Sequence, residues 1–216
     1  MNGLNIKAQV NGKVKIITAR VPSCWEEMTV AQYIRILKEW EDGTAIEDRD
    51  YFKLLNILND GKFTGFEDTV ENHVSLTNIL GWVIVQPFEF SEDLPKVLVI
   101  NGKVVDIPRH PKELSIGQNI VLRRDYIEKT KKLGENIAIA TAIYLQPIVD
   151  KSLFKANRAQ EIAKEIEQMP INLIYPIGFF LLERAMRFGQ NPGKSLPLIK
   201  TNLGETLKKM WLGWRK

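Results

Sequence analysis

The sequence contains one cysteine, Cys24, and two histidines, His73 and His110. A single cysteine excludes an internal disulfide and fits a reducing compartment. A zinc site takes about four convergent nitrogen, sulfur or oxygen ligands, which these scattered residues do not supply. We therefore expect no resident metal. Both histidines are interpreted as surface residues, and Cys24 as a structural residue rather than a nucleophile.

Short catalytic motifs are also missing. The sequence has no Walker-type phosphate loop, no GxGxxG and no EF-hand spacing. The adjacent acids at 26–27 and 92–93 cannot face each other across a cleft, as paired catalytic carboxylates must. We predict no catalytic residue and no cofactor site, and we expect a protein that is not an enzyme.

Long hydrophobic runs are absent as well. The longest apolar stretches, 137–145 and 173–182, fall far short of the roughly 20 residues that a membrane-spanning helix needs, and Pro176 interrupts the second. The first residues are polar and lack the apolar segment of a secretory signal. We expect no membrane span and interpret both stretches as core.

The composition is that of a folded protein, with 44% hydrophobic and 26% charged residues in 216. The net charge of +4 is unevenly distributed. From Lys194 onward, six lysines and arginines stand against one acid, Glu205, so the rest of the chain is close to neutral. This distribution does not indicate a specific nucleic-acid surface.

An internal repeat organises the chain at an offset of 86 residues, from Pro22 to Pro108. Seven aligned pairs around this point are identical or conservative, and the same register aligns Ile57 with Ile143. The aligned residues are Pro22, Glu27, Met28, Thr29, Val30, Ala31 and Gln32 with Pro108, Glu113, Leu114, Ser115, Ile116, Gly117 and Gln118.

Each copy is preceded by a β-hairpin signal. Asn11-Gly12 and Asn101-Gly102 both lie between apolar, β-branched runs. Asn-Gly in this setting favours a type I′ turn, because both central residues of that turn need positive φ. We predict hairpins at 4–21 and 96–107.

Each copy then starts a helix with the same motif. A threonine or serine hydroxyl accepts from an N–H of the first turn, and a glutamine three residues later accepts from the N–H of the capping residue. An apolar residue before the cap is placed to pack on the first turn as a hydrophobic staple. These residues are Thr29, Gln32 and Met28 in the first copy, and Ser115, Gln118 and Leu114 in the second.

The predicted fold class is α+β and mostly helical, with two diverged tandem copies of a hairpin-plus-helices unit and a C-terminal amphipathic helix. The predicted domains are 1–90, a larger second copy at 91–190, and a linker with tail at 191–216. Helices are predicted at about 30–40, 51–58, 69–85, 115–131, 135–149, 153–168, 171–189 and 202–214.

The tail helix is basic and rich in tryptophan. Its apolar residues recur at helical spacing after a Pro/Gly-rich link: Leu203, Leu207, Met210, Trp211 and Trp214. Three placements stay open, namely the chain's own core, a groove on a neighbouring subunit or partner, and a membrane or nucleic-acid surface. We assign these five residues as candidate interaction residues, since tryptophan is enriched at interface hot spots.

The pattern P-x(4)-E-[ML]-[ST]-[VI]-[AG]-Q, which starts at Pro22 and Pro108 after a hairpin, resembles ring proteins of the tail and collar in crAss-like podoviruses. The opening W-x-E-[ML]-[ST]-x-x-Q at 25–32 is also similar to tail or baseplate-hub assembly chaperones of contractile-tailed phages. The motif covers about a fifth of the chain and carries no catalytic residue with it.

The first resemblance implies a structural role in the virion, after assembly in the host cytoplasm. It implies self-association in a ring of six or twelve copies, and contacts with neighbouring tail, collar or portal proteins. We expect the hairpins or the tail helix to supply these contacts. The second resemblance implies an assembly chaperone that is absent from the finished particle.

Overall fold

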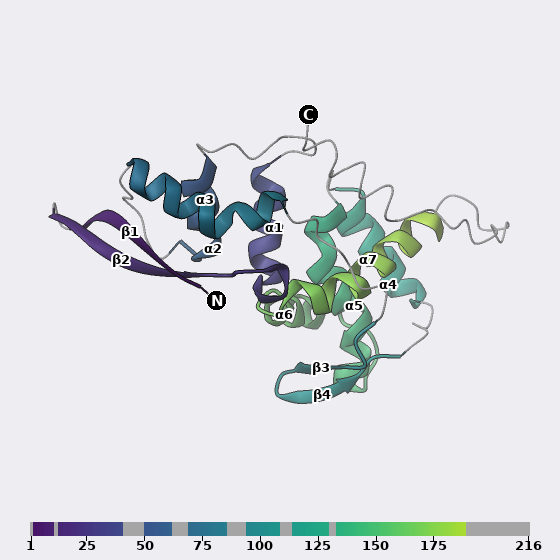
Figure 1. Cartoon of the computed structure of the whole chain (residues 1–216). Helices are drawn as coiled ribbons and strands as arrows, with labels where there is room; N and C mark the ends of the chain where they lie inside the picture. The colour runs from purple at the N-terminus through teal and green to yellow at the C-terminus, as the bar shows by residue number, and fades with distance from the viewer. Residues whose placement is uncertain are drawn as a thin grey trace. The chain divides into compact units, whose positions relative to one another are not determined.

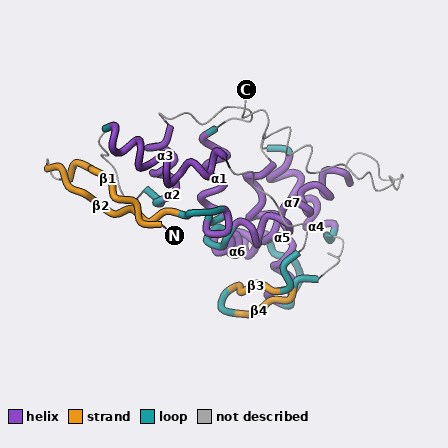
Figure 2. The backbone as a smooth tube through the Cα atoms, viewed as in Figure 1, coloured by secondary structure: helices purple, strands orange, loops and turns teal. Residues whose placement is uncertain are grey.

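The computed structural model describes residues 2–10, 13–40, 50–61, 69–85, 94–108, 114–129 and 133–188. Over these residues the protein is α+β and mostly helical, with two antiparallel hairpins and seven α-helices, as the sequence predicts (Figures 1 and 2). The predicted tail helix at 202–214 lies outside the described residues.

The described chain divides into two compact units. The first contains residues 2–28 and 35–85, and the second contains 29–34 and 94–188. Helix α1 (Val30–Glu39) therefore begins in the second unit and continues in the first.

The first hairpin joins β1 (Asn2–Val10) to β2 (Lys13–Val21), with Asn2 opposite Val21 and Val10 opposite Lys13. Burial alternates along β1 and along β2 from Ile17 to Val21, because successive side chains point to opposite faces. The inner face buries Leu4, Ile6, Ala8, Ala19 and Val21. Strand β1 lies against α3 (Val70–Val85). The predicted hairpin at 4–21 is confirmed, while the turn residues 11–12 lie outside the described range.

Helix α1 starts with its N–H groups paired. The side chain of Thr29 accepts from Gln32 N at 3.2 Å, and Gln32 Oε1 accepts from Thr29 N at 3.0 Å, which confirms the first capping box. Two further N–H groups, which a helix cannot pair internally, reach carbonyls at the end of α6 (Ala156–Ile166): Val30 N donates to Met169 O and Ala31 N to Glu167 O.

Helices α2 (Tyr51–Leu58) and α3 pack on each other in the first unit. Helix α2 has the predicted bounds and ends where Asp60 and Gly61 take φ of 59° and 70°. Positive φ reverses the chain and lets Gly61 N donate to a carbonyl of the last turn, which explains why Asn-Asp-Gly terminates this helix.

The second hairpin joins β3 (Val97–Ile100) to β4 (Lys103–Asp106). Asn101 and Gly102 form the connection with φ of 52° and 69°, which is the predicted type I′ turn. Ile107 N donates to Lys96 O and extends the ladder, so the predicted hairpin at 96–107 is confirmed.

The second capping box is also confirmed, since Ser115 and Gln118 exchange both hydrogen bonds at the start of α4 (Ile116–Val121). Both predicted staple residues, Met28 and Leu114, are buried. In the second copy the fourth helical residue is the polar Asn119, and its Nδ2 donates to the carbonyl of Leu114 at 2.9 Å. A hydrogen bond thus joins these two positions of the second copy.

The helix predicted near 115–131 is α-helical only in its first half. After Val121 the chain widens into a π-helical segment, η3 (Leu122–Ile127), and then a 3-10 turn, η4 (Leu133–Asn136), leads into α5 (Ile137–Asp150). Hydrophobic periodicity does not distinguish α from π turns over one or two turns, so the sequence pattern did not reveal this change.

Gln118 also joins α4 to α5. Its Nε2 donates to the carbonyl of Ile143 at 2.6 Å in a buried position. That carbonyl would normally accept from the residue four positions later, which is Pro147 and has no N–H. The glutamine side chain therefore supplies the donor that proline removes.

Helix α5 packs against α6 and α7 (Ile171–Phe188) and forms the core of the second unit. The predicted start of α6 at 153 is wrong, because Lys151 takes a left-handed conformation and the buried Gln146 accepts from Lys155 N at 2.8 Å. The helix begins only after this turn. None of the helices in the described part is long and apolar enough to cross a membrane.

Gly178 of α7 lies against α5 with no room for a side chain. A Cβ at this position would lie 2.7 Å from Ile137 Cγ2 and O and 2.8 Å from Thr141 Oγ1. We expect Gly178→Ala to lower the free energy of unfolding by about 1–3 kcal/mol through overpacking. Gly81→Ala in α3 is the matched control, because nothing lies within 4 Å of its Cβ. Gly81→Ala should raise the free energy of unfolding, measured in urea, by about 0.5–1 kcal/mol. Equal effects would contradict the close contact.

Replacing Gln118 tests its bond to α5. Gln118→Ala removes the glutamine half of the capping box and leaves the Ile143 carbonyl buried without its side-chain donor, so we expect a loss of about 2–4 kcal/mol in the free energy of unfolding. Ser115→Ala removes the serine half of the capping box alone and should cost about 1 kcal/mol. Denaturant unfolding of both variants measures the difference. Similar losses would show that the bond to Ile143 adds nothing to stability.

Candidate interaction surfaces

The outer edge of β1 is covered by a side-chain amide. Asn72 of α3 is 2% exposed; its Oδ1 accepts from Lys7 N at 3.0 Å and its Nδ2 donates to Lys7 O at 2.9 Å. The amide thus pairs with both edge groups of Lys7 as a neighbouring strand would. Glu71 forms an ion pair with the ammonium group of the same residue.

This contact fixes which backbone groups of β2 point outward. The N–H and C=O of Lys7 bond Asn72 and not the facing residue, Ile16, so Lys7 and Ile16 are a non-hydrogen-bonded pair. In such a pair the backbone groups of both residues point away from the hairpin. The N–H and C=O of Ile16, and by alternation those of Val14 and Thr18, therefore face the far edge of β2. Within the described residues, β2 has no strand neighbour except β1.

Strand β2 carries two exposed apolar side chains. Val14 is 55% exposed and Ile16 is 70% exposed. Lys13, Lys15 and Arg20 lie on the same strand, and no ion pair joins them to another residue within the described part of the chain. An open edge, exposed β-branched residues and unpaired cations are thus combined on one strand.

The second hairpin presents a similar outer face with less charge. Val97 (48% exposed), Val99 (56%) and Val104 (70%) share this face with Asp106. Val104 follows its Asn-Gly turn at the same position as Val14 follows the first, so the repeat places an exposed valine equivalently in both hairpins. The turn is anchored, because Asn101 N donates to Glu165 Oε1 of α6 at 2.6 Å.

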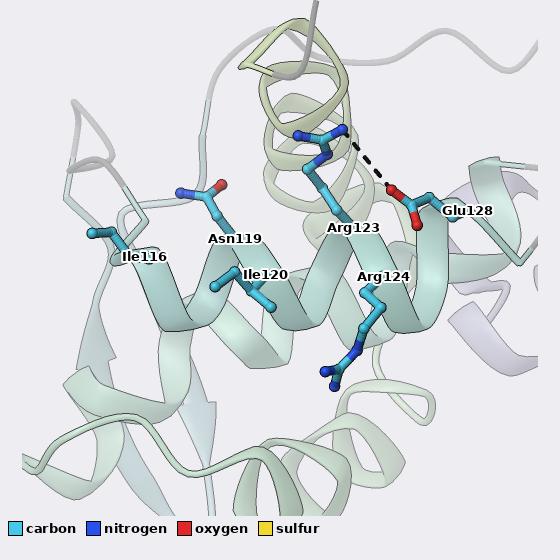
Figure 3. Close-up of a pocket in the computed structure, with 6 residues that line it drawn as sticks. All are labelled: Ile116, Asn119, Ile120, Arg123, Arg124 and Glu128. Carbon is cyan, nitrogen blue, oxygen red and sulfur yellow. Dashed lines mark ion pairs between the residues drawn. The ribbon is translucent and has the colours of Figure 1, made fainter. Parts of the chain in front are cut away.

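A shallow groove runs along α4 and η3 (Figure 3). Ile116 and Ile120 project from one side of this helix and are 81% and 52% exposed. Arg123 reaches Glu128 at 3.9 Å, and Arg124 pairs with Asp125 at 2.8 Å. The Arg124 guanidinium lowers the pKa of the Asp125 carboxyl. The groove thus combines two exposed isoleucines with arginines that already have acidic partners.

Residues with catalytic potential are dispersed. Burial raises the pKa of the Cys24 thiol, which keeps it protonated and a poor nucleophile. His73 packs edge-on against Phe52 at 5.0 Å between ring centroids and is half-buried, rather than the surface residue that the sequence suggests. His110 lies outside the described residues. Among the described residues no cluster of three His, Cys, Asp or Glu side chains has metal-binding geometry.

The predicted interaction residues of the tail, Leu203, Leu207, Met210, Trp211 and Trp214, lie outside the described residues and stay predictions. The capping residues Thr29, Gln32, Ser115 and Gln118 act within the fold. Sequence reasoning identified the two hairpins but not the roles of Asn72, Val14 and Ile16. An asparagine on a helix gives no local signal that it pairs with a strand 65 residues earlier.

Asn72→Ala should expose the edge of β1 at Lys7 and remove the two hydrogen bonds that Asn72 makes to the backbone of Lys7. We expect a loss of about 1–3 kcal/mol in stability and faster hydrogen exchange of the Lys7 amide. Glu71→Gln is the control, because its ion pair with Lys7 is solvent-exposed and contributes at most about 1 kcal/mol. Unchanged exchange at Lys7 in Asn72→Ala would contradict the edge-covering role.

The sequence matches no protein-family model, and comparison with curated proteins and with solved structures found no significant match either.

Proposed function

We propose that the chain is a non-enzymatic structural protein of a phage virion, a ring or adaptor subunit of the tail or collar that acts through protein–protein contacts. The observation that carries the assembly role is the repeated display of exposed valines, Val14 and Val104, at equivalent positions of two hairpins. Soluble domains bury β-branched residues where they can, and contiguous exposed ones mark contact surfaces.

The two hairpins suit different contacts because their charges differ. The first carries four cations and no acid over residues 2–21, so two copies of it repel each other. The outer face of the second carries Asp106 as its single charge among three valines, so copies of the chain can approach it without strong repulsion. The second hairpin is therefore the better candidate for self-association in a ring.

The location in a phage tail or collar rests on the sequence motif that starts at Pro22 and Pro108. Quantitative mass spectrometry of purified virions tests it, and we expect the chain at a stoichiometry of six or twelve per particle. Absence from finished particles, together with binding to a tail component during assembly, would instead support the assembly chaperone.

Self-association is tested separately on the purified chain by native mass spectrometry. We expect a closed oligomer, and Val104→Lys should shift it toward monomer by placing a charge in the contact. Val70→Lys is the matched control, because Val70 is 81% exposed on α3 and belongs to neither hairpin. Both substitutions should leave the thermal midpoint within a few degrees, since exposed positions cost about 0.5 kcal/mol or less. An oligomer that both variants preserve would exclude the second hairpin as the contact.

A further inference from the structure

We propose that the open edge of β2 binds an extended acidic segment of a partner protein, which joins the first hairpin as a third strand. This inference rests on the assembly role proposed above and names the chemistry of one partner. It follows from three features of the hairpin: the direction of the free backbone groups, the alternation of the side chains, and the charge.

The backbone groups are arranged for strand addition. The N–H and C=O of Val14, Ile16 and Thr18 point outward at every second residue, a spacing of about 6.8 Å, which an added antiparallel or parallel strand can pair with. The opposite edge at β1 is occupied by the Asn72 amide. Within the described residues, β2 is therefore the edge of this hairpin that is open to a partner at its centre, and the fold defines the position of the added strand.

The side chains of β2 specify an alternating partner. Val14 and Ile16 lie on one face of the strand, whereas Lys13 and Lys15 lie on the other. An added strand has the same alternation, so its side chains on one face meet the two apolar residues and those on the other face meet the two lysines. Apolar residues alternating with carboxylates satisfy both faces.

Charge decides between an acidic partner and a second copy of β2. The first hairpin contains Lys7, Lys13, Lys15 and Arg20 and no acid over residues 2–21. Glu71 pairs with Lys7, and the other three cations have no ion-pair partner in the described part of the chain. Lysines on an open edge discourage pairing between identical chains, while they attract carboxylates. The cationic edge is thus selective for an acidic strand.

Binding is measured with the full chain and a fluorescein-labelled eight-residue peptide of alternating valine and glutamate. We expect saturable binding by fluorescence anisotropy that weakens as salt is raised. The peptide of alternating valine and lysine has the same strand propensity and should not bind. Hydrogen exchange should show added protection at the amides of Val14, Ile16 and Thr18 and none at β3 or β4.

Two substitutions at one position separate backbone pairing from side-chain contact. Ile16→Pro removes the outward N–H but no bond to β1, and should weaken peptide binding at least about tenfold. Ile16→Thr keeps the N–H and the strand preference, and should weaken binding only about threefold. Lys13→Gln with Lys15→Gln should weaken binding and flatten its salt dependence.

Equal binding by Ile16→Pro and wild type, binding of the valine–lysine peptide, or protection outside β2 would each overturn the inference. So would self-association of the wild-type chain through protected β2 amides, which would make a second copy the occupant. If Ile16→Pro does not fold, the exchange map of the wild-type complex decides the site. Failure of peptide binding with the chain present in virions would refute this inference alone, whereas absence from virions would refute the proposed function alone.

Discussion

Every backbone N–H and C=O that folding removes from water needs a hydrogen-bonding partner, and the architecture of this chain depends on how that requirement is met where regular structure cannot meet it. Pro147 leaves the Ile143 carbonyl without its helical donor, and the Gln118 amide supplies one. The N-terminus of α1 is completed by the Thr29 side chain and by two carbonyls that follow α6. Both replacements lie in the second unit.

The same requirement distinguishes the two edges of the first hairpin. Asn72 pairs with both backbone groups of Lys7, so α3 holds β1 in place and covers its edge. Strand β2 carries lysines, Val14 and Ile16 at its surface, and β1 is its only strand neighbour within the described residues. Pairing with β1 already holds β2 in the extended conformation, and a segment held in its bound conformation loses less entropy when a partner binds.

The repeat has diverged in its surfaces more than in its framework. Both copies keep the hairpin, the capping box and a buried staple residue. The first hairpin has nine-residue strands and is cationic, whereas the second has four-residue strands, few charges, and a turn anchored to Glu165. Duplication of one folding unit with different exposed side chains gives a chain two distinct contact surfaces, which suits the assembly role proposed for it.

Local sequence signals predicted the elements whose physics is local. Asn-Gly between β-branched runs favours a hairpin turn, and a Thr or Ser three residues before Gln favours a helix start when an apolar helical pattern follows. The predicted bounds of α2 and of the hairpins are therefore close to those observed. The sequence did not predict the π-helical segment η3, because hydrophobic periodicity does not distinguish α from π turns. It did not predict the late start of α6, because that depends on the hydrogen bond from Lys155 N to the buried Gln146.

Turn geometry, capping and periodicity act over a few residues, so the strands, the helices and the repeated framework can be recognised from the amino-acid order alone. What those segments expose depends on contacts between residues far apart in the chain. Whether β1 or β2 has the open edge depends on Asn72, which lies 65 residues from Lys7, and whether Gln118 merely caps α4 or also completes α5 depends on Pro147 in another helix. Such pairings arise when distant segments pack together, so local sequence patterns do not predict them.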